Sequence, residues 1–196
     1  MFGAACFSPD GQYLAVGGDW VTVWDGAGEH QLFAIAKEER VVKHNCQFSP
    51  NGLVLATADM NHISLYNFQT RKSFAKLTTR TTIDHLCFSP DSASIAIACG
   101  NEFFLWDIRS NQKQAIANPK GGISGLVSFS PDGKLVACSS WDDTIIYDVT
   151  TRRAIWQNNA TRDLDVQGMQ FSGGGVFLRD LIRHRAWVVE DLLQKL

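Results

Sequence analysis

The stretch FSPDGKLVACSSWDDTIIYD, residues 129–148, decides the fold of this chain. The turn signal SPDG is followed by the apolar run KLVAC, a second turn SSWDD and the apolar run TIIYD. This order predicts a small β-meander, in which short strands alternate with tight turns. Two short strands cannot bury a core by themselves, so the segment must pack against another part of the protein.

Two landmarks of this stretch recur along the chain at one period. Phe-Ser-Pro begins at four positions and the variant Phe-Ser-Gly at a fifth: Phe7, Phe48, Phe88, Phe129 and Phe171. An aromatic residue followed by Asp or Asn comes 17 or 18 residues after each of the first four: Trp24, Tyr66, Trp106 and Tyr147. Successive copies are 40 to 42 residues apart. One period and one mutual spacing over four units indicate an internal repeat.

Each repeat unit predicts four short strands. An inner strand ends at the repeated Phe, a second follows the Ser-Pro turn, a third ends at the aromatic residue, and an outer strand follows. The middle strands are apolar on both faces, which is typical of a sheet covered on both sides. We therefore expect one all-β domain over residues 1–196, without an internal linker. Its units span roughly residues 1–37, 38–79, 80–118, 119–159 and 160–196.

The C-terminal segment VFLRDLIRHRAWVVEDLLQKL allows two interpretations. It can form two strands, with Trp187 as a degraded copy of the repeated aromatic residue. It can also form a helix, because Leu178, Leu181 and Leu192 are among the apolar residues that fall near helical spacing. We expect strands up to about Val189, followed by a short helical or frayed tail.

The repeat resembles the WD-repeat family over nearly the whole chain. The four Ser-Pro turns, the strands VTVWD and FFLWD and the segment SSWDDTIIYD carry this resemblance. It implies a β-propeller of four-stranded blades. Typical members also carry a Gly-His pair whose His joins a buried hydrogen-bond chain, but this sequence contains no Gly-His dipeptide. We therefore expect a divergent member, or a relative in another propeller family such as the translation-initiation-factor type.

The number of units is five, whereas the resemblance implies about seven blades for a closed propeller. Five blades at the usual wedge angle form an open arc or partial ring, whose terminal faces need a cap. Three arrangements stay open at this point. The chain is a piece of a longer, seven-bladed propeller, it assembles with itself or with a chain that completes the ring, or it closes tightly as five blades.

Composition and charge restrict the classes of partner. The net charge is −2, so we expect neither a nucleic acid nor a membrane as the partner. No stretch approaches the roughly 20 apolar residues of a membrane helix, and no signal peptide is recognisable. The five cysteines form no CxxC pair or Cys/His cluster, which argues against a disulfide framework or a zinc site. We expect reduced packing cysteines and a cytoplasmic protein, with the nucleus as the alternative.

Motifs of known catalytic chemistry do not occur in the sequence. There is no GxSxG, no HExxH, no phosphate-binding glycine loop and no EF-hand loop. Asp84 and His85 are neighbours on an expected strand, so their side chains point to opposite faces and cannot share a proton. We therefore expect no catalytic residue, no cofactor, no metal ion and no enzyme activity.

Binding residues are expected in the turns after the second strand of each unit, because loops on a rigid scaffold carry function. The candidates are Trp20, His62, Glu102, Trp141, Arg183 and Arg185. Trp20 and Trp141 occupy comparable turns, and Trp is favoured at binding hot spots. The alternative is that each Trp folds over the neighbouring blade as packing.

The function implied by the resemblance is a non-catalytic scaffold that binds other proteins or peptides. A first alternative is a propeller of the translation-initiation-factor type that contacts RNA or the ribosome, with Arg183 and Arg185 as the basic residues. A second alternative is a small-molecule hydrolase with its site in a central channel. That enzyme needs convergent acid, His or metal-binding groups at the starts of the inner strands, and the sequence shows none.

Overall fold

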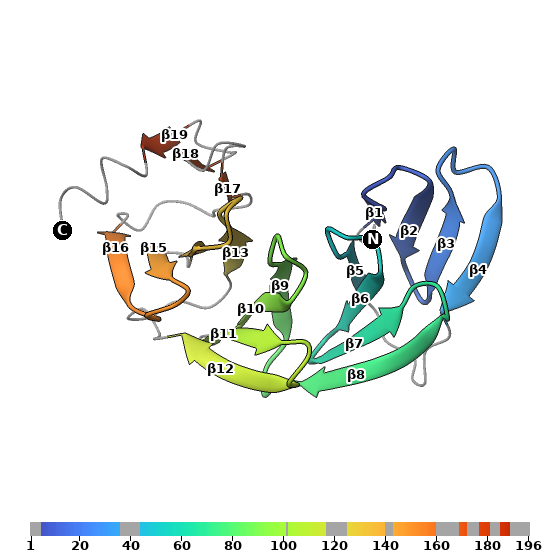
Figure 1. The fold of residues 1–196 in the computed structure, drawn as a ribbon, viewed down its shortest axis with the longest axis horizontal. Helices are drawn as coiled ribbons and strands as arrows, with labels where there is room; N and C mark the ends of the chain where they lie inside the picture. Colours follow the sequence, from blue (N-terminus) through green and yellow to red (C-terminus); the bar gives the residue numbers. More distant parts are fainter. Residues whose placement is uncertain are drawn as a thin grey trace. The chain divides into compact units, whose positions relative to one another are not determined.

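The computed structural model describes residues 5–35, 44–100, 102–116, 125–139, 143–159, 169–171, 177–180 and 185–188. Within these ranges every regular element is a β-strand, and the strands form antiparallel sheets of consecutive strands (Figure 1). Four sheets have four strands and the fifth has three. The predicted all-β class and four-stranded unit are therefore confirmed. The described strands fall into two compact units, residues 1–83 (unit 1) and 84–196 (unit 2).

Unit 1 holds two sheets, each a meander of four strands (Figure 1). The first consists of β1 (Ala5–Phe7), β2 (Tyr13–Gly17), β3 (Val21–Asp25) and β4 (Gln31–Ile35). The second consists of β5 (His44–Phe48), β6 (Val54–Asp59), β7 (His62–Asn67) and β8 (Lys72–Thr78). The expectation that residues 1–196 form a single domain with the five blade boundaries given above stays a prediction.

Unit 2 holds the other three sheets, and the first strand of this group begins at the boundary of the unit. They consist of β9 (Ile83–Phe88), β10 (Ser94–Cys99), β11 (Glu102–Asp107) and β12 (Gln112–Ile116); β13 (Leu126–Phe129), β14 (Leu135–Ser139), β15 (Asp143–Asp148) and β16 (Ala154–Asn159); and β17 (Met169–Phe171), β18 (Phe177–Asp180) and β19 (Arg185–Val188). The C-terminal segment thus contains strands up to residue 188, as expected. The predicted tail beyond Val189 lies outside the described residues.

The Ser-Pro turn has the same hydrogen bonds in four sheets, and its serine holds it together. In β13–β14 the Leu135 amide donates to Ser130 Oγ at 2.9 Å, and Ser130 Oγ donates to Asp132 Oδ1 at 2.6 Å. The equivalent serines, Ser8, Ser49 and Ser89, accept from the equivalent amides at 2.9 Å. All four serines are buried. The repeated serine is therefore a structural residue that satisfies a backbone amide below the surface.

The last residue of this turn adopts a left-handed backbone conformation. Gly11, Gly52 and Gly133 have φ angles of 71° to 72° there, and Ser92 takes the same position with φ of 61°. Glycine reaches this region without steric cost, whereas a side chain is disfavoured in it. The third turn therefore keeps the geometry of the others although its glycine is replaced.

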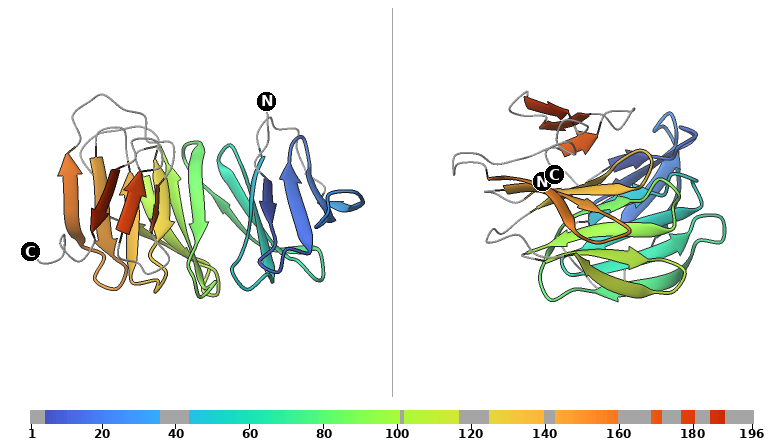
Figure 2. Two further views of the ribbon diagram at one scale, coloured as in Figure 1. Left: turned by 90° about the horizontal axis from the view of Figure 1, so that it is seen from above. Right: turned by 60° about the vertical axis from the view of Figure 1, so that its left-hand side comes forward.

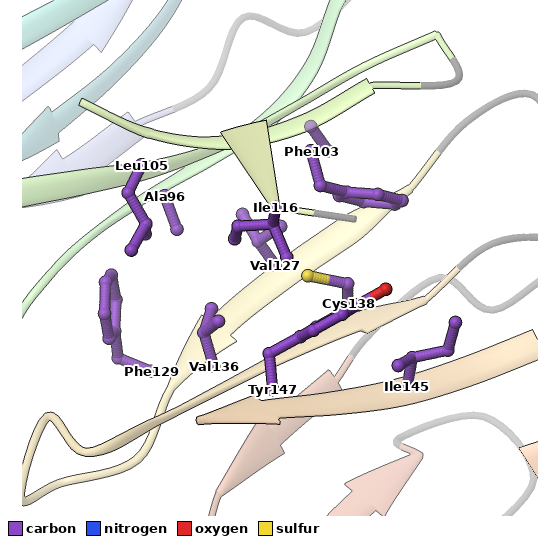
Figure 3. Close-up of a cluster of buried hydrophobic side chains, with 11 residues drawn as sticks. Ala96, Phe103, Leu105, Ile116, Val127, Phe129, Val136, Cys138, Ile145 and Tyr147 are labelled. Atoms are coloured by element: carbon purple, nitrogen blue, oxygen red, sulfur yellow. The ribbon is translucent and has the colours of Figure 1, made fainter. Parts of the chain in front are cut away.

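Neighbouring sheets within each unit pack through the repeated Phe and the residues paired with it. In unit 2 the row Phe129, Val136 and Tyr147 crosses the sheet β13–β16. This row packs on small and apolar side chains of β10 and β11, including Ala96 and Leu105 (Figure 3). Within unit 2 the sheet β13–β16 therefore buries its apolar face against the sheet that precedes it in the chain.

The same packing recurs at two further places. In unit 1, Phe48 and Leu55 pack on Ala15 and Val23 of the first sheet. In unit 2, Phe171 of the last sheet packs on Ala137 and Ile146 of the sheet before it. In each case a row of large side chains packs against small side chains of the neighbouring sheet. Units that repeat along the sequence therefore pack in the same way.

Candidate functional site

The turns between second and third strands lie together at one end of the sheets in unit 1. The Ser-Pro turns mark the opposite end, since a Cβ added at Gly52 would lie 3.7 Å from Cδ of Pro9 in the neighbouring sheet. Strands β2 and β6 run away from those turns, so they bring the turns β2–β3 and β6–β7 to the other end (Figure 2). Unit 2 repeats the arrangement, since a Cβ added at Gly133 would lie 3.5 Å from Cδ of Pro90.

Two large apolar side chains are exposed at this end of unit 1. Trp20, in the turn β2–β3, is 51% exposed, and Met60, in the turn β6–β7, is 55% exposed. Asp19 and His62 beside them are also exposed. We refer to Asp19, Trp20, Met60, Asn61 and His62 as the Trp20 surface. About half of the Trp20 residue is therefore accessible to solvent.

Met60 sits in a strained turn that the surrounding backbone holds in place. Its φ angle is 38°, and the equivalent position in the next repeat is Gly100, with φ of 56°. The Met60 carbonyl accepts a hydrogen bond from the Ile83 amide at 2.5 Å. Strain of this kind persists only where neighbouring contacts impose it, and it gathers at functional sites. The sequence singled out this turn through His62 and not through Met60; the available signal for Met60 was a methionine inside the polar turn DMNH.

The rest of this turn is fixed by Thr79, which is buried. The Thr79 amide donates to the Asn61 carbonyl at 2.8 Å, and Asn61 Nδ2 donates to the Thr79 carbonyl at 3.2 Å. These bonds hold the turn against the end of β8. The Met60 side chain is therefore presented from a rigid support, which lowers the entropy lost when a ligand contacts it.

The other predicted binding residues are distributed as follows. His62 begins β7, with Nδ1 at 3.1 Å from Thr78 Oγ1. Glu102 begins β11 in unit 2, where its Oε2 lies 3.5 Å from Nζ of Lys113. Arg185 begins β19. Trp141 and Arg183 lie outside the described residues. The structure therefore brings Trp20 and His62 to one end of unit 1 and places Glu102 in the equivalent turn of a unit 2 sheet.

Asp84 and His85 point to different neighbours, as expected for adjacent strand residues. Asp84 Oδ2 accepts from the Gly100 amide at 2.9 Å in its own sheet, whereas His85 Nδ1 accepts from the Val127 amide at 3.4 Å in the next sheet. Burial raises the pKa of the Asp84 carboxyl and lowers the pKa of the His85 ring. The side chain of each residue accepts a hydrogen bond from a backbone amide, and the two side chains do not form an acid–base pair.

The described residues contain neither a candidate metal site nor a candidate membrane-spanning helix. No three His, Cys, Asp or Glu side chains in the described ranges gather in a way that could hold a metal ion. Among the same residues there is no helix of the length and apolarity needed to cross a membrane.

A known protein family matches two segments of the repeat. The family model for the WD domain, G-beta repeat, matches residues 3–25 and 111–147. The chain is a divergent member of the WD-repeat family. Members of this family are generally non-catalytic and typically bind other proteins. The resemblance inferred from the Ser-Pro turns and the closing aromatic-Asp pairs is therefore confirmed.

Curated relatives share the repeat at low identity. Periodic tryptophan protein 2 of Arabidopsis thaliana is 26% identical over 73% of this chain and 17% of its own length. Apoptotic protease-activating factor 1 of Danio rerio is 28% identical over 71% of this chain and 12% of its own length. The chain thus spans less than a fifth of these WD-repeat relatives.

A solved structure shows the same fold. The β-propeller domain of Cps50 (Swd1) from Myceliophteria thermophila superimposes with a TM-score of 0.76 at 17% identity, over 89% of this chain and 60% of that one. At this identity the likeness concerns the fold, and it confirms the predicted β-propeller class. Whether the blades form an open arc, a tight ring or part of a seven-bladed propeller stays a prediction.

Proposed function

We propose that this WD-repeat chain is a non-catalytic scaffold that binds another protein or peptide at the Trp20 surface. The observation that carries the proposal is the exposure of Trp20 and Met60 in corresponding turns of the two sheets of unit 1. Trp is enriched at binding hot spots, and Met adapts to irregular apolar surfaces. The partner therefore presents an apolar side chain or strip to this surface.

The strain at Met60 supports this reading. A left-handed conformation costs a residue with a side chain roughly 1–2 kcal/mol relative to glycine, and the next repeat has Gly100 at this position. A methionine at this position therefore costs backbone strain although more than half of its surface stays exposed. A contact with a partner would offset that cost.

Two remaining features belong to the same proposal. We place the protein in the cytoplasm, with the nucleus as the alternative, because its cysteines are reduced and packed in the fold. We also keep Trp141, Arg183 and Glu102 as predicted contact residues in equivalent turns. No observation favours contact with RNA or the ribosome, or small-molecule hydrolysis, and we propose neither.

The test compares the proteins retained by the immobilised chain with those retained by two variants. Trp20→Ala and Met60→Gly are each expected to weaken capture of a specific partner about 30-fold, the effect of losing a hot spot worth about 2 kcal/mol. Met60→Gly relieves the left-handed strain, so its thermal stability should equal or exceed that of the wild type. Quantitative mass spectrometry of the captured proteins and thermal unfolding are the readouts.

Phe74→Ala is the matched control, because Phe74 is 50% exposed in the outer strand β8, away from the Trp20 surface. It should retain the partner. If both surface variants keep every specific partner of the wild type, the Trp20 surface is not the binding site.

A second interaction surface is carried by the face of the sheet β1–β4 opposite its core. Phe7, Leu14 and Trp24 form the row that corresponds to Phe129, Val136 and Tyr147 in unit 2. In unit 2 a neighbouring sheet buries this row, whereas Phe7 is 58% exposed and Leu14 and Trp24 are half-buried. No sheet among the described strands of unit 1 covers this apolar row, which has the form of a sheet-packing face.

We propose that a second copy of this chain covers the Phe7 row, since sheets of this chain cover the equivalent rows elsewhere in it. Light scattering over a tenfold dilution should show a mass above the 21.7 kDa of one chain that falls on dilution. Phe7→Asp should abolish that increase, because a carboxylate cannot be buried there without large cost. A wild-type chain that stays monomeric at every concentration contradicts self-association and directs the search to a different chain that completes the ring.

A further inference from the structure

Two cysteines of unit 1 meet across neighbouring sheets. Cys6 lies in β1 and Cys46 in β5, and their sulfur atoms are 3.9 Å apart. Both are reduced thiols in the structure. Cys46 is buried inside the packing between the sheets, whereas Cys6 is half-buried and so has one side open to solvent. The pair thus combines an accessible sulfur with a protected one.

The repeat shows that packing does not require a second thiol here. Cys6 stands one residue before the repeated Phe and Cys46 two residues before it. In the sheets of unit 2 the equivalent residues are Cys87 and Val127, and Cys87 packs against the cluster that contains Val127. Valine therefore fills the position of Cys46 without loss of the arrangement. The contact between the Cys6 and Cys46 thiols is therefore not required for the packing.

The two thiols differ in acidity in the way that a reactive pair requires. Contact with the Cys46 thiol lowers the pKa of Cys6. The contact with Cys6, together with burial, raises the pKa of Cys46. Cys6 is also the more exposed of the two sulfurs, so water can solvate its thiolate, which is the nucleophilic form of cysteine.

We propose that Cys6 and Cys46 form a reversible disulfide bond between the two sheets of unit 1 when the protein meets a hydroperoxide. The Cys6 thiolate attacks the terminal peroxide oxygen, the O–O bond breaks, and the leaving alkoxide takes up a proton to give the alcohol. Cys6 is now a sulfenic acid. The Cys46 sulfur attacks the Cys6 sulfur, the S–S bond forms, and hydroxide leaves with the Cys46 proton as water. Two thiols are oxidised by two electrons, and the hydroperoxide is reduced.

The geometry requires only a local closing movement. A disulfide bond holds its sulfurs about 2.05 Å apart, so the pair must approach by about 1.9 Å from its reduced separation. Strand β1 has three residues and is the terminal strand of its sheet, bonded to β2 along one edge among the described strands. It can therefore shift toward β5 without breaking a ladder on its other side. A thiol reductant reverses the reaction by exchange.

The experiment treats the purified chain with one equivalent of hydrogen peroxide and counts thiols by mass spectrometry. We expect loss of two of the five thiols and their recovery with dithiothreitol. Tryptic digestion separates the cysteines, because Cys6 falls in residues 1–37, Cys46 in residues 44–71, and the other three elsewhere. A linked peptide of these two segments is the expected product. The oxidised chain should also unfold at a higher temperature than the reduced chain, since the bridge restricts the unfolded state.

Cys46→Val is the matched variant, because it reproduces the pair Cys87 and Val127 of unit 2. Peroxide should then leave Cys6 as a sulfenic acid that dimedone labels, with no linked peptide. The wild-type digest decides the proposal even if this variant fails to fold. Linkage through other cysteines, over-oxidation of Cys6 beside a reduced Cys46, or no loss of thiols would overturn it.

Discussion

Replacing Phe103 with Ala is expected to lower the free energy of unfolding by about 3–5 kcal/mol. The Phe103 ring is 3% exposed and is packed between the sheets β9–β12 and β13–β16, beside Ile116, Val127 and Cys138 (Figure 3). The substitution loses the free energy gained by transferring the ring from water into the core. It also leaves a cavity that the closely packed strands cannot close. Domains are stable by only about 5–15 kcal/mol. Urea unfolding followed by the fluorescence of the six tryptophans measures the change.

The control for this substitution is Phe74→Ala. Phe74 is 50% exposed in β8, so the same change of side chain should alter stability by no more than about 0.5 kcal/mol. The difference between the two variants isolates burial between sheets from the loss of a phenyl ring as such. Equal effects of the two substitutions would show that Phe103 is not part of a packed core.

Replacing Ser130 with Ala is expected to cost about 1–3 kcal/mol, the penalty for leaving a buried polar group without its partner. Ser130 is 2% exposed, and its hydroxyl both accepts from the Leu135 amide and donates to Asp132. Alanine leaves the amide without an acceptor below the surface. Because the Ser130 hydroxyl is the main group that lowers the pKa of Asp132, that pKa should also rise in the variant. Urea unfolding and NMR titration of the carboxyl check the two effects.

Ser110→Ala provides the comparison for a solvated hydroxyl. Ser110 Oγ donates to Asp107 Oδ1 at 2.7 Å, a bond much like that of Ser130, but the residue is exposed. Water can replace this bond, so the change in stability should stay within about 0.5 kcal/mol. If Ser130→Ala is equally mild, the repeated serine does not hold the turn and its recurrence has another cause.

The sequence by itself determined the repeat, the all-β class and the position of each turn. The landmark Phe129 and its copies, the Ser-Pro turns and the closing aromatic residues act through contacts within about 20 residues of chain. A turn serine bonds an amide five residues ahead, and strand alternation has a period of two. Such local rules operate in the same way in every copy of the repeat. The positions of the strands could therefore be predicted from the sequence alone.

Tertiary structure decided whether equivalent residues of the repeat are buried or exposed and which residues they contact. Phe7 and Phe129 are equivalent in sequence, yet Phe7 is exposed and Phe129 is buried. Within unit 2 a sheet packs on Phe129, whereas no sheet among the described strands of unit 1 packs on Phe7. The exposure of Met60 and the meeting of Cys6 with Cys46 depend likewise on neighbouring sheets and on backbone held by distant residues. The burial of a side chain, the strain of a turn and the contact of two thiols depend on residues from different sheets. The period of the sequence does not specify how those sheets pack.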